Sequence, residues 1–165
     1  MKPLPAKCVL VPLLLTALIA TGCGGGGKAR INAKPYNLSI TKNTPSAIEV
    51  DVIGVTDIEK PAWEGYSINN YWTPGDQRRT DADKLTMDLP TGKEWVIDRE
   101  NPQWKKWLDR GVTWVLIIAR LPGRFEGGAS DPRRIFVSLD KNAWKEKTIR
   151  FEVLDSGIRS LTPQK

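Results

Sequence analysis

The sequence predicts an all-β fold, a β-sandwich of about seven or eight short strands with one or two short helices. Three observations lead to this prediction. Short segments alternate between apolar and polar residues, turn-forming residues separate these segments, and one clear amphipathic helical pattern interrupts them. Alternation at this short period is typical of half-buried strands, and a chain of 165 residues is the size of one domain.

The first 22 residues divide into the three parts of a bacterial signal peptide. A short basic segment contains Lys2 and Lys7, and an apolar run of 12 residues follows at 9–20. This run is shorter than the roughly 20 residues of a membrane-spanning helix. The next residues, up to Gly22 and Cys23, resemble the lipobox of bacterial lipoproteins, in which the chain is cut before a cysteine that carries acyl groups.

The resemblance to this signal implies cleavage between Gly22 and Cys23 and lipidation of Cys23. Cys8 leaves with the signal peptide, so the folded domain keeps no thiol to form a disulfide. Gly24 rather than Asp follows the cysteine, which by resemblance to sorted lipoproteins implies an outer-membrane anchor with the domain in the periplasm. An ordinary secretory signal with a chance cysteine, or a buried apolar helix, is the alternative.

Residues 23–30 are expected to form a glycine-rich tether, and residues 31–165 the periplasmic β-sandwich domain. Strands are expected at 31–40 and 48–53, paired as a hairpin through the turn at 42–46. The segment from 56 to 80 follows neither a strand nor a helix period. It is expected to be a long connection with one short helical turn, ending at Pro74 and Gly75.

Alternation continues at 85–89 and 93–97, which predicts two more strands. Residues 101–111 combine an early proline, apolar side chains at helical spacing and a final glycine, and they predict a short amphipathic helix. The most apolar segment, 112–119, is expected to be a central strand buried on both faces. A glycine-rich loop, strands at 135–139 and 149–153, and a short last strand near Ile158 complete an immunoglobulin-like sandwich.

Composition excludes several kinds of chemistry. The chain has no His, which removes imidazole bases and His metal ligands. Its 25 basic and 19 acidic residues are interspersed along the chain, which disfavours a nucleic-acid surface. The acidic pairs Asp81/Asp83 and Glu94/Asp98 lack a motif that would orient a general acid and base. We therefore expect a protein that is not an enzyme and holds no cofactor or metal.

Seven tryptophans are the most unusual feature of the composition. We expect the core to contain Trp104, Trp107 and Trp114. Trp63 and Trp72, together with Tyr71, lie in the irregular segment and are candidates for a surface that stacks on sugar rings or binds a protein. The pairs Arg78-Arg79 and Arg133-Arg134 are expected to be solvated charges, with binding of phosphate or acidic groups as the alternative.

The order of these features resembles the outer-membrane lipoprotein of type VI secretion systems. The shared features are a lipobox, a short tether, a hairpin with a Pro turn, a helical insertion, an apolar central strand and a closing pair of strands. The resemblance implies a transthyretin-like sandwich that binds the periplasmic end of an inner-membrane partner. The turn at 42–46 takes the place of the family's first inter-strand loop, which implies partner contacts at Asn43, Thr44 and Pro45.

Two functions of different classes follow. The first is a membrane-anchored periplasmic lipoprotein that docks another envelope protein, in a type VI secretion system by resemblance. The alternative is a lipoprotein that binds peptidoglycan or another carbohydrate through Trp63, Tyr71 and Trp72. A hydrolase that relies on carboxylates alone would require two acidic side chains facing each other across a cleft.

Overall fold

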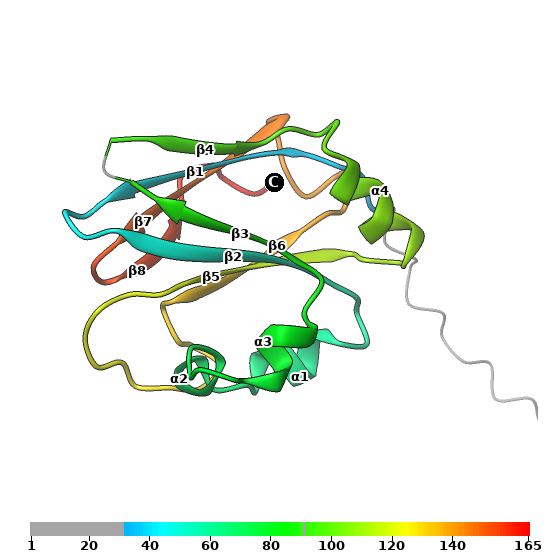
Figure 1. Cartoon of the computed structure of the whole chain (residues 1–165). Helices are drawn as coiled ribbons and strands as arrows, with labels where there is room; N and C mark the ends of the chain where they lie inside the picture. Colours follow the sequence, from blue (N-terminus) through cyan, green and yellow to red (C-terminus); the bar gives the residue numbers. More distant parts are fainter. Residues whose placement is uncertain (1–31, 91) are drawn as a thin grey trace, which may run out of the picture. The chain divides into compact units, whose positions relative to one another are not determined.

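The computed structural model describes residues 32–90 and 92–165, so the predicted cleavage site at Gly22 and Cys23 and the tether lie outside the described residues. Within those ranges the chain forms eight strands in two four-stranded sheets, together with four short helices (Figure 1). The predicted all-β sandwich is therefore confirmed. The strands are β1 (Asn37–Asn43), β2 (Ile48–Val55), β3 (Lys84–Leu89), β4 (Glu94–Ile97), β5 (Trp114–Ala119), β6 (Arg134–Ser138), β7 (Thr148–Leu154) and β8 (Gly157–Ser160).

The first sheet has the strand order β4-β1-β7-β8. Strand β1 pairs antiparallel with β4, where Leu38 lies opposite Ile97, and parallel with β7, where Ile40 lies opposite Phe151. The second sheet has the order β3-β2-β5-β6 and is antiparallel throughout. The alternating apolar residues of both sheets meet between them and form the main core.

The predicted hairpin between the first two strands is wrong. Strand β1 belongs to one sheet and β2 to the other, so residues 44–47, rather than the expected turn at 42–46, cross from sheet to sheet. Leu38 and Ile40 on β1 and Val50 and Val52 on β2 are all fully buried in the same core. Alternation showed which side chains point inward, but a strand from a distant part of the chain takes each neighbouring position.

Helix α4 (Pro102–Asp109) confirms the predicted amphipathic helix and closes one end of the core. It begins where the Asn101 side chain accepts a hydrogen bond from the Gln103 amide at 2.9 Å, and Pro102 takes the first turn. Trp104 and Trp107 are 2% and 0% exposed, which confirms that both belong to the core. The two rings contact edge to face, with centroids 5.2 Å apart.

Three short helices lie in the segment where one helical turn was expected: α1 (Lys60–Glu64), α2 (Ile68–Tyr71) and α3 (Gln77–Asp81). They cover the outer face of the second sheet (Figure 1). Residues 115–118 of β5 are all fully buried, as predicted for a strand enclosed on both faces. Trp114, at the start of this strand, is only half-buried and donates its indole N–H to Asp57 at 2.7 Å.

None of the helices in the described part of the chain is long and apolar enough to cross a bilayer.

Gly54 provides a test of the packing between β2 and α4. A Cβ at this position would lie 2.5 Å from the indole of Trp107, which is fully buried and has little freedom to move. We expect Gly54→Ala to lower the free energy of unfolding by about 1–3 kcal/mol, as overpacking of a close-packed core does. Urea unfolding followed by tryptophan fluorescence measures this change.

Gly65→Ala is the matched control, because its nearest new contact is the carbonyl oxygen of Pro61 at an ordinary 3.7 Å. Its stability should stay within about 0.5 kcal/mol of the wild type or rise slightly. Equal stability of the two variants would contradict the tight contact at Gly54.

Candidate interaction surface

The aromatic residues proposed as a partner surface lie mostly inside the molecule. Trp63 and Tyr71 are 7% and 0% exposed and pack with Ile53, Val55 and Leu116 in a second apolar cluster. Trp72 is half-buried beside them, with its ring edge-to-face on Tyr71. A ring that stacks on a sugar needs an open face, and Trp63 and Tyr71 have none, so their prediction as a surface is wrong.

A buried carboxylate fixes these helices to the sheet. Asp51 on β2 is fully buried and faces the helical layer. It accepts hydrogen bonds from the Tyr71 hydroxyl at 2.7 Å, the Arg79 Nε at 3.0 Å and the Thr86 hydroxyl at 2.5 Å. A buried charge is tolerated when it is paired and its oxygens are hydrogen-bonded, and Asp51 meets both conditions.

Arg79 links this carboxylate to the surface. Its guanidinium also bonds to Glu49 and lies 4.3 Å from the centre of the Trp72 ring. Burial acts to lower the pKa of Arg79, but the hydrogen bonds that its guanidinium donates to Asp51 and Glu49 raise the pKa above its usual value. Burial, together with Asp51, likewise raises the pKa of Tyr71, so its hydroxyl remains a donor at any physiological pH.

The second arginine pair is also internal, and the expectation of solvated charges there is wrong. Arg133 and Arg134 are 5% and 6% exposed. Arg133 forms a bidentate ion pair with Asp131, with its Nε 2.9 Å from Oδ1 and its Nη2 2.6 Å from Oδ2. Its Nη1 also donates to the Asn69 side-chain oxygen at 2.8 Å. Arg134 donates to the main-chain oxygens of Trp63 at 2.6 Å and Tyr66 at 2.9 Å. Both residues therefore tie the start of β6 to the helical layer.

Arg78 differs from its neighbour Arg79. Its guanidinium lies over the rings of Trp63 and Tyr66, at 4.4 and 4.7 Å from their centres. Its Nε is buried and finds no hydrogen-bond acceptor among the described residues. Stacking on aromatic rings thus holds Arg78 in place.

The acidic pairs have separate structural roles. Asp81 accepts from the Gln77 side-chain Nε2 at 2.7 Å, and Asp83 accepts from the Gln103 side-chain Nε2 at 2.6 Å. Glu94 accepts from the Ser39 hydroxyl. Over residues 32–90 and 92–165, no group of three or more potential ligands is placed to hold a metal ion.

The β1–β2 turn forms part of the end of the domain opposite α4 (Figure 1). Asn43 and Pro45 are exposed, but Thr44 is only 6% exposed because its hydroxyl bonds to Asp155 in the β7–β8 turn. Thr44, one of the three residues expected to contact a partner, is therefore buried and stabilises the turn. Asn43 and Pro45 remain accessible.

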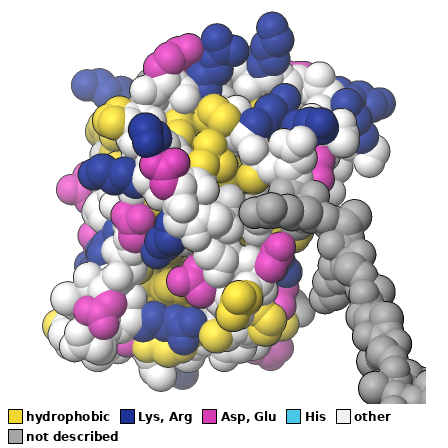
Figure 2. All heavy atoms as spheres, turned by 90° about the vertical axis from the view of Figure 1, so that its right-hand side faces the viewer, with side chains coloured by type: hydrophobic (Ala, Val, Ile, Leu, Met, Phe, Trp, Pro, Cys, Tyr) yellow, Lys and Arg dark blue, Asp and Glu magenta, His cyan; other side chains and the backbone are white. Residues whose placement is uncertain are grey.

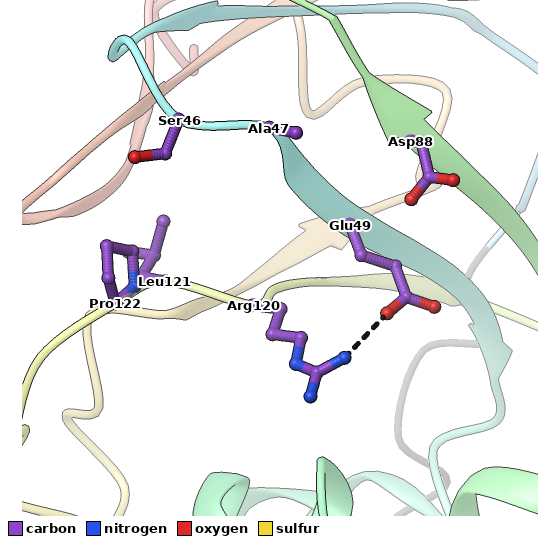
Figure 3. A pocket seen from close by; sticks show the side chains of 7 residues that line it. All are labelled: Ser46, Ala47, Glu49, Asp88, Arg120, Leu121 and Pro122. Carbon is purple, nitrogen blue, oxygen red and sulfur yellow. Dashed lines mark hydrogen bonds and ion pairs between the residues drawn. The ribbon is translucent and has the colours of Figure 1, made fainter.

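A shallow hollow of about 440 Å³ adjoins this turn (Figure 3). Ser46, Ala47, Leu121 and Pro122 line one side, and on the other side Arg120 extends toward Glu49, with Asp88 next to Glu49 on the neighbouring strand β3. Arg120 is 57% exposed on its side chain and lies 3.4 Å from Glu49, a loose ion pair. The lining residues are Ser46, Ala47, Glu49, Asp88, Arg120, Leu121 and Pro122. The turn and this hollow make one surface, which we call the distal surface.

Comparison with known proteins places this fold. No family model and no curated protein matches the sequence. A chain of a structure described as "Type VI membrane complex" is similar, with a TM-score of 0.52, 13% identity, and coverage of 78% of this chain and 98% of that chain. The protein shares that fold.

Two further structures are similar. A chain described as "T6SS protein TssM C-terminal domain (869-1107) from EAEC" has a TM-score of 0.53 and 11% identity, covering 76% of this chain and 99% of that one. The Serratia marcescens Lip protein, a membrane-bound component of the type VI secretion system, has a TM-score of 0.49 and 13% identity, covering 79% and 98%. The first two likenesses establish the fold alone.

Arg79 and Arg120 both contact Glu49, but only Arg79 also contacts the buried Asp51. Comparing variants of the two arginines therefore tests the buried network. Arg79→Met should lower the free energy of unfolding by about 3 kcal/mol, because it leaves the fully buried Asp51 without its cation. Arg120→Met removes only the loose, exposed contact to Glu49 and should cost about 0.5 kcal/mol or less. Urea unfolding of both variants measures the difference.

In the double variant Asp51→Asn/Arg79→Met, part of the lost stability should return, since no unpaired charge is then buried. Similar losses for Arg79→Met and Arg120→Met would show that the buried pair does not hold the helical layer.

Proposed function

We propose that this protein is a lipid-anchored docking component of a bacterial envelope complex of the type VI secretion kind. The observation that carries the proposal is the shared fold. Nearly the whole length of a chain in a type VI membrane complex, 98%, aligns with this domain. An N-terminal segment that resembles a lipoprotein signal precedes the domain, which fits a component held at a membrane.

In this proposal, Cys23 carries the acyl groups and anchors the chain in the outer membrane, with the domain in the periplasm. Several acyl chains hold a protein far more firmly than one does. Anchoring confines the domain to a thin layer beside the membrane, so even a weak contact with a periplasmic partner gains effective concentration.

The distal surface is the proposed docking site for a periplasmic or inner-membrane protein. Strand β1 begins near the point where the chain enters the domain, and its seven residues run to Asn43. At about 3.3 Å per residue, this strand alone carries the β1–β2 turn roughly 20 Å away from that point. The exposed Asn43 and Pro45, with Arg120 in the adjoining hollow, therefore face away from the anchored end.

The carbohydrate-binding alternative loses its main support, because two of its three proposed aromatic rings are buried. The role proposed here requires no catalysis, cofactor or metal.

Cys23→Ser tests the anchor. The variant should move from the outer-membrane fraction to the soluble periplasmic fraction, because it cannot be acylated. Cys8→Ser is the matched control and should fractionate like the wild type, since Cys8 lies in the predicted signal peptide. Immunoblots of separated membranes measure this, and a Cys23→Ser protein that still follows the outer membrane would refute lipidation as the attachment.

Affinity capture from crosslinked envelopes tests the docking site. The wild type should enrich one inner-membrane protein, and the paired substitution Asn43→Arg/Pro45→Arg should reduce its yield at least about tenfold, as loss of a central interface contact does. Lys106→Glu, at an exposed position on α4 at the opposite end of the domain, is the control and should keep the partner. Full recovery with the turn variant would contradict docking there. Saturable binding to purified peptidoglycan that Trp72→Ala abolishes would favour the carbohydrate alternative.

A further inference from the structure

Four segments meet where the chain enters the described domain. The Lys34 amide donates to the Leu139 carbonyl, the Lys141 amide to Asn32 and the Lys165 amide to Ala143, each at 3.0 Å. The segment before α4 joins them through a bond of 2.8 Å from the Arg99 amide to the Asn37 side chain. We call this surface, made of residues 32–36, 98–112, 139–147 and 162–165, the basic end.

The positive charge of the domain is concentrated there. The basic end has nine basic and five acidic residues, whereas the rest of residues 32–165 has twelve basic and fourteen acidic residues. Figure 2 views the side of the domain that carries α4, and Lys and Arg side chains gather along its upper part. The positive excess of the domain therefore comes entirely from one surface.

Ion pairs account for most of the acidic side chains at the basic end. Glu100 pairs with Arg99, Asp109 with Lys105, and Glu146 with Arg150. Five exposed lysines, by contrast, form no side-chain hydrogen bond or ion pair with any residue that the structure describes. These lysines are Lys106, Lys141, Lys145, Lys147 and Lys165. Since they hold no part of the fold together, their charge is available to an external partner.

The length of chain before the domain identifies that partner. Eight residues, 24–31, lie between Cys23, the proposed lipid attachment, and Asn32, so nine Cα–Cα steps join the two. Fully extended, they span roughly 30 Å, and a glycine-rich chain of this length averages about 15–18 Å between its ends. The surface around Asn32 is thus kept close to the lipid headgroups, where an anionic surface attracts lysines within about one Debye length, roughly 8 Å.

We propose that the basic end lies against anionic phospholipid headgroups of the membrane that holds the lipid anchor. The inference rests on the anchor of the proposed function and adds the orientation of the domain. The lysine ammonium is a compact point charge on a flexible stem, which suits attraction to mobile phosphates. The segment that follows β2 carries the acidic residues Asp57 and Glu59, which anionic headgroups would repel. The side of the domain formed by α4 and residues 139–147 therefore turns toward the lipid.

Lysine acylation of the lipidated protein tests this orientation. The protein is reconstituted in phosphatidylcholine vesicles with or without about one third phosphatidylglycerol and treated with an amine-reactive ester, and each lysine is read by mass spectrometry. On the anionic vesicles, Lys106, Lys141 and Lys145 should react at least about threefold more slowly, and about 1 M salt should remove the difference. Lys93, exposed at the other end of the domain, should react equally on both kinds of vesicle.

Two double variants that remove the same amount of charge extend the experiment, one as a test and the other as its control. Lys141→Gln/Lys145→Gln should at least halve the protection of Lys106, and Lys93→Gln/Arg124→Gln should leave it unchanged. Equal rates on both vesicles, or equal protection of Lys93, would overturn the orientation while leaving the anchor intact. A wild-type protein that washes off both kinds of vesicle would contradict the anchor and, with it, this inference.

Discussion

The rest of the structure depends on the hydrogen bonds and the ion pair that the buried carboxylate of Asp51 forms. This carboxylate brings together β2, α2, α3 and β3, because Tyr71, Arg79 and Thr86 all bond to its two oxygens. Helices α1, α2 and α3 have only four or five residues each, too few to be stable alone in water. Their packing on the second sheet, held by this polar cluster and by Arg134, encloses β5 on both faces.

A sandwich with two different ends is the consequence of this construction. The chain enters beside α4 and the five exposed lysines of the basic end, and the β1–β2 turn with its hollow lies at the other end of the strands. Because strands of this length keep the two ends apart, the proposed membrane contact and the proposed protein contact would use different surfaces. The anchor, the orientation and the docking surface proposed above form one functional scheme.

Much of the strand layout was predictable because side-chain burial follows a period of two. Leu85, Met87 and Leu89 alternate, and they lie in β3; residues 115–118 are continuously apolar, and β5 is enclosed on both faces. The helix at 102–109 was predictable from its early proline, the spacing of its apolar residues and the glycine that follows it. Strand partners were not, since alternation does not say which distant strand lies alongside.

The sequence by itself determined the class of fold, the main core tryptophans Trp104 and Trp107, and the lack of imidazole chemistry, because these follow from local pattern and composition. Only the tertiary structure decided the roles of the arginines and of Trp63 and Tyr71. Arg133 and Arg134 meet acceptors 64 to 71 residues away at Asn69 and Trp63. Whether a long polar or aromatic side chain is buried depends on such distant partners, which no local pattern specifies.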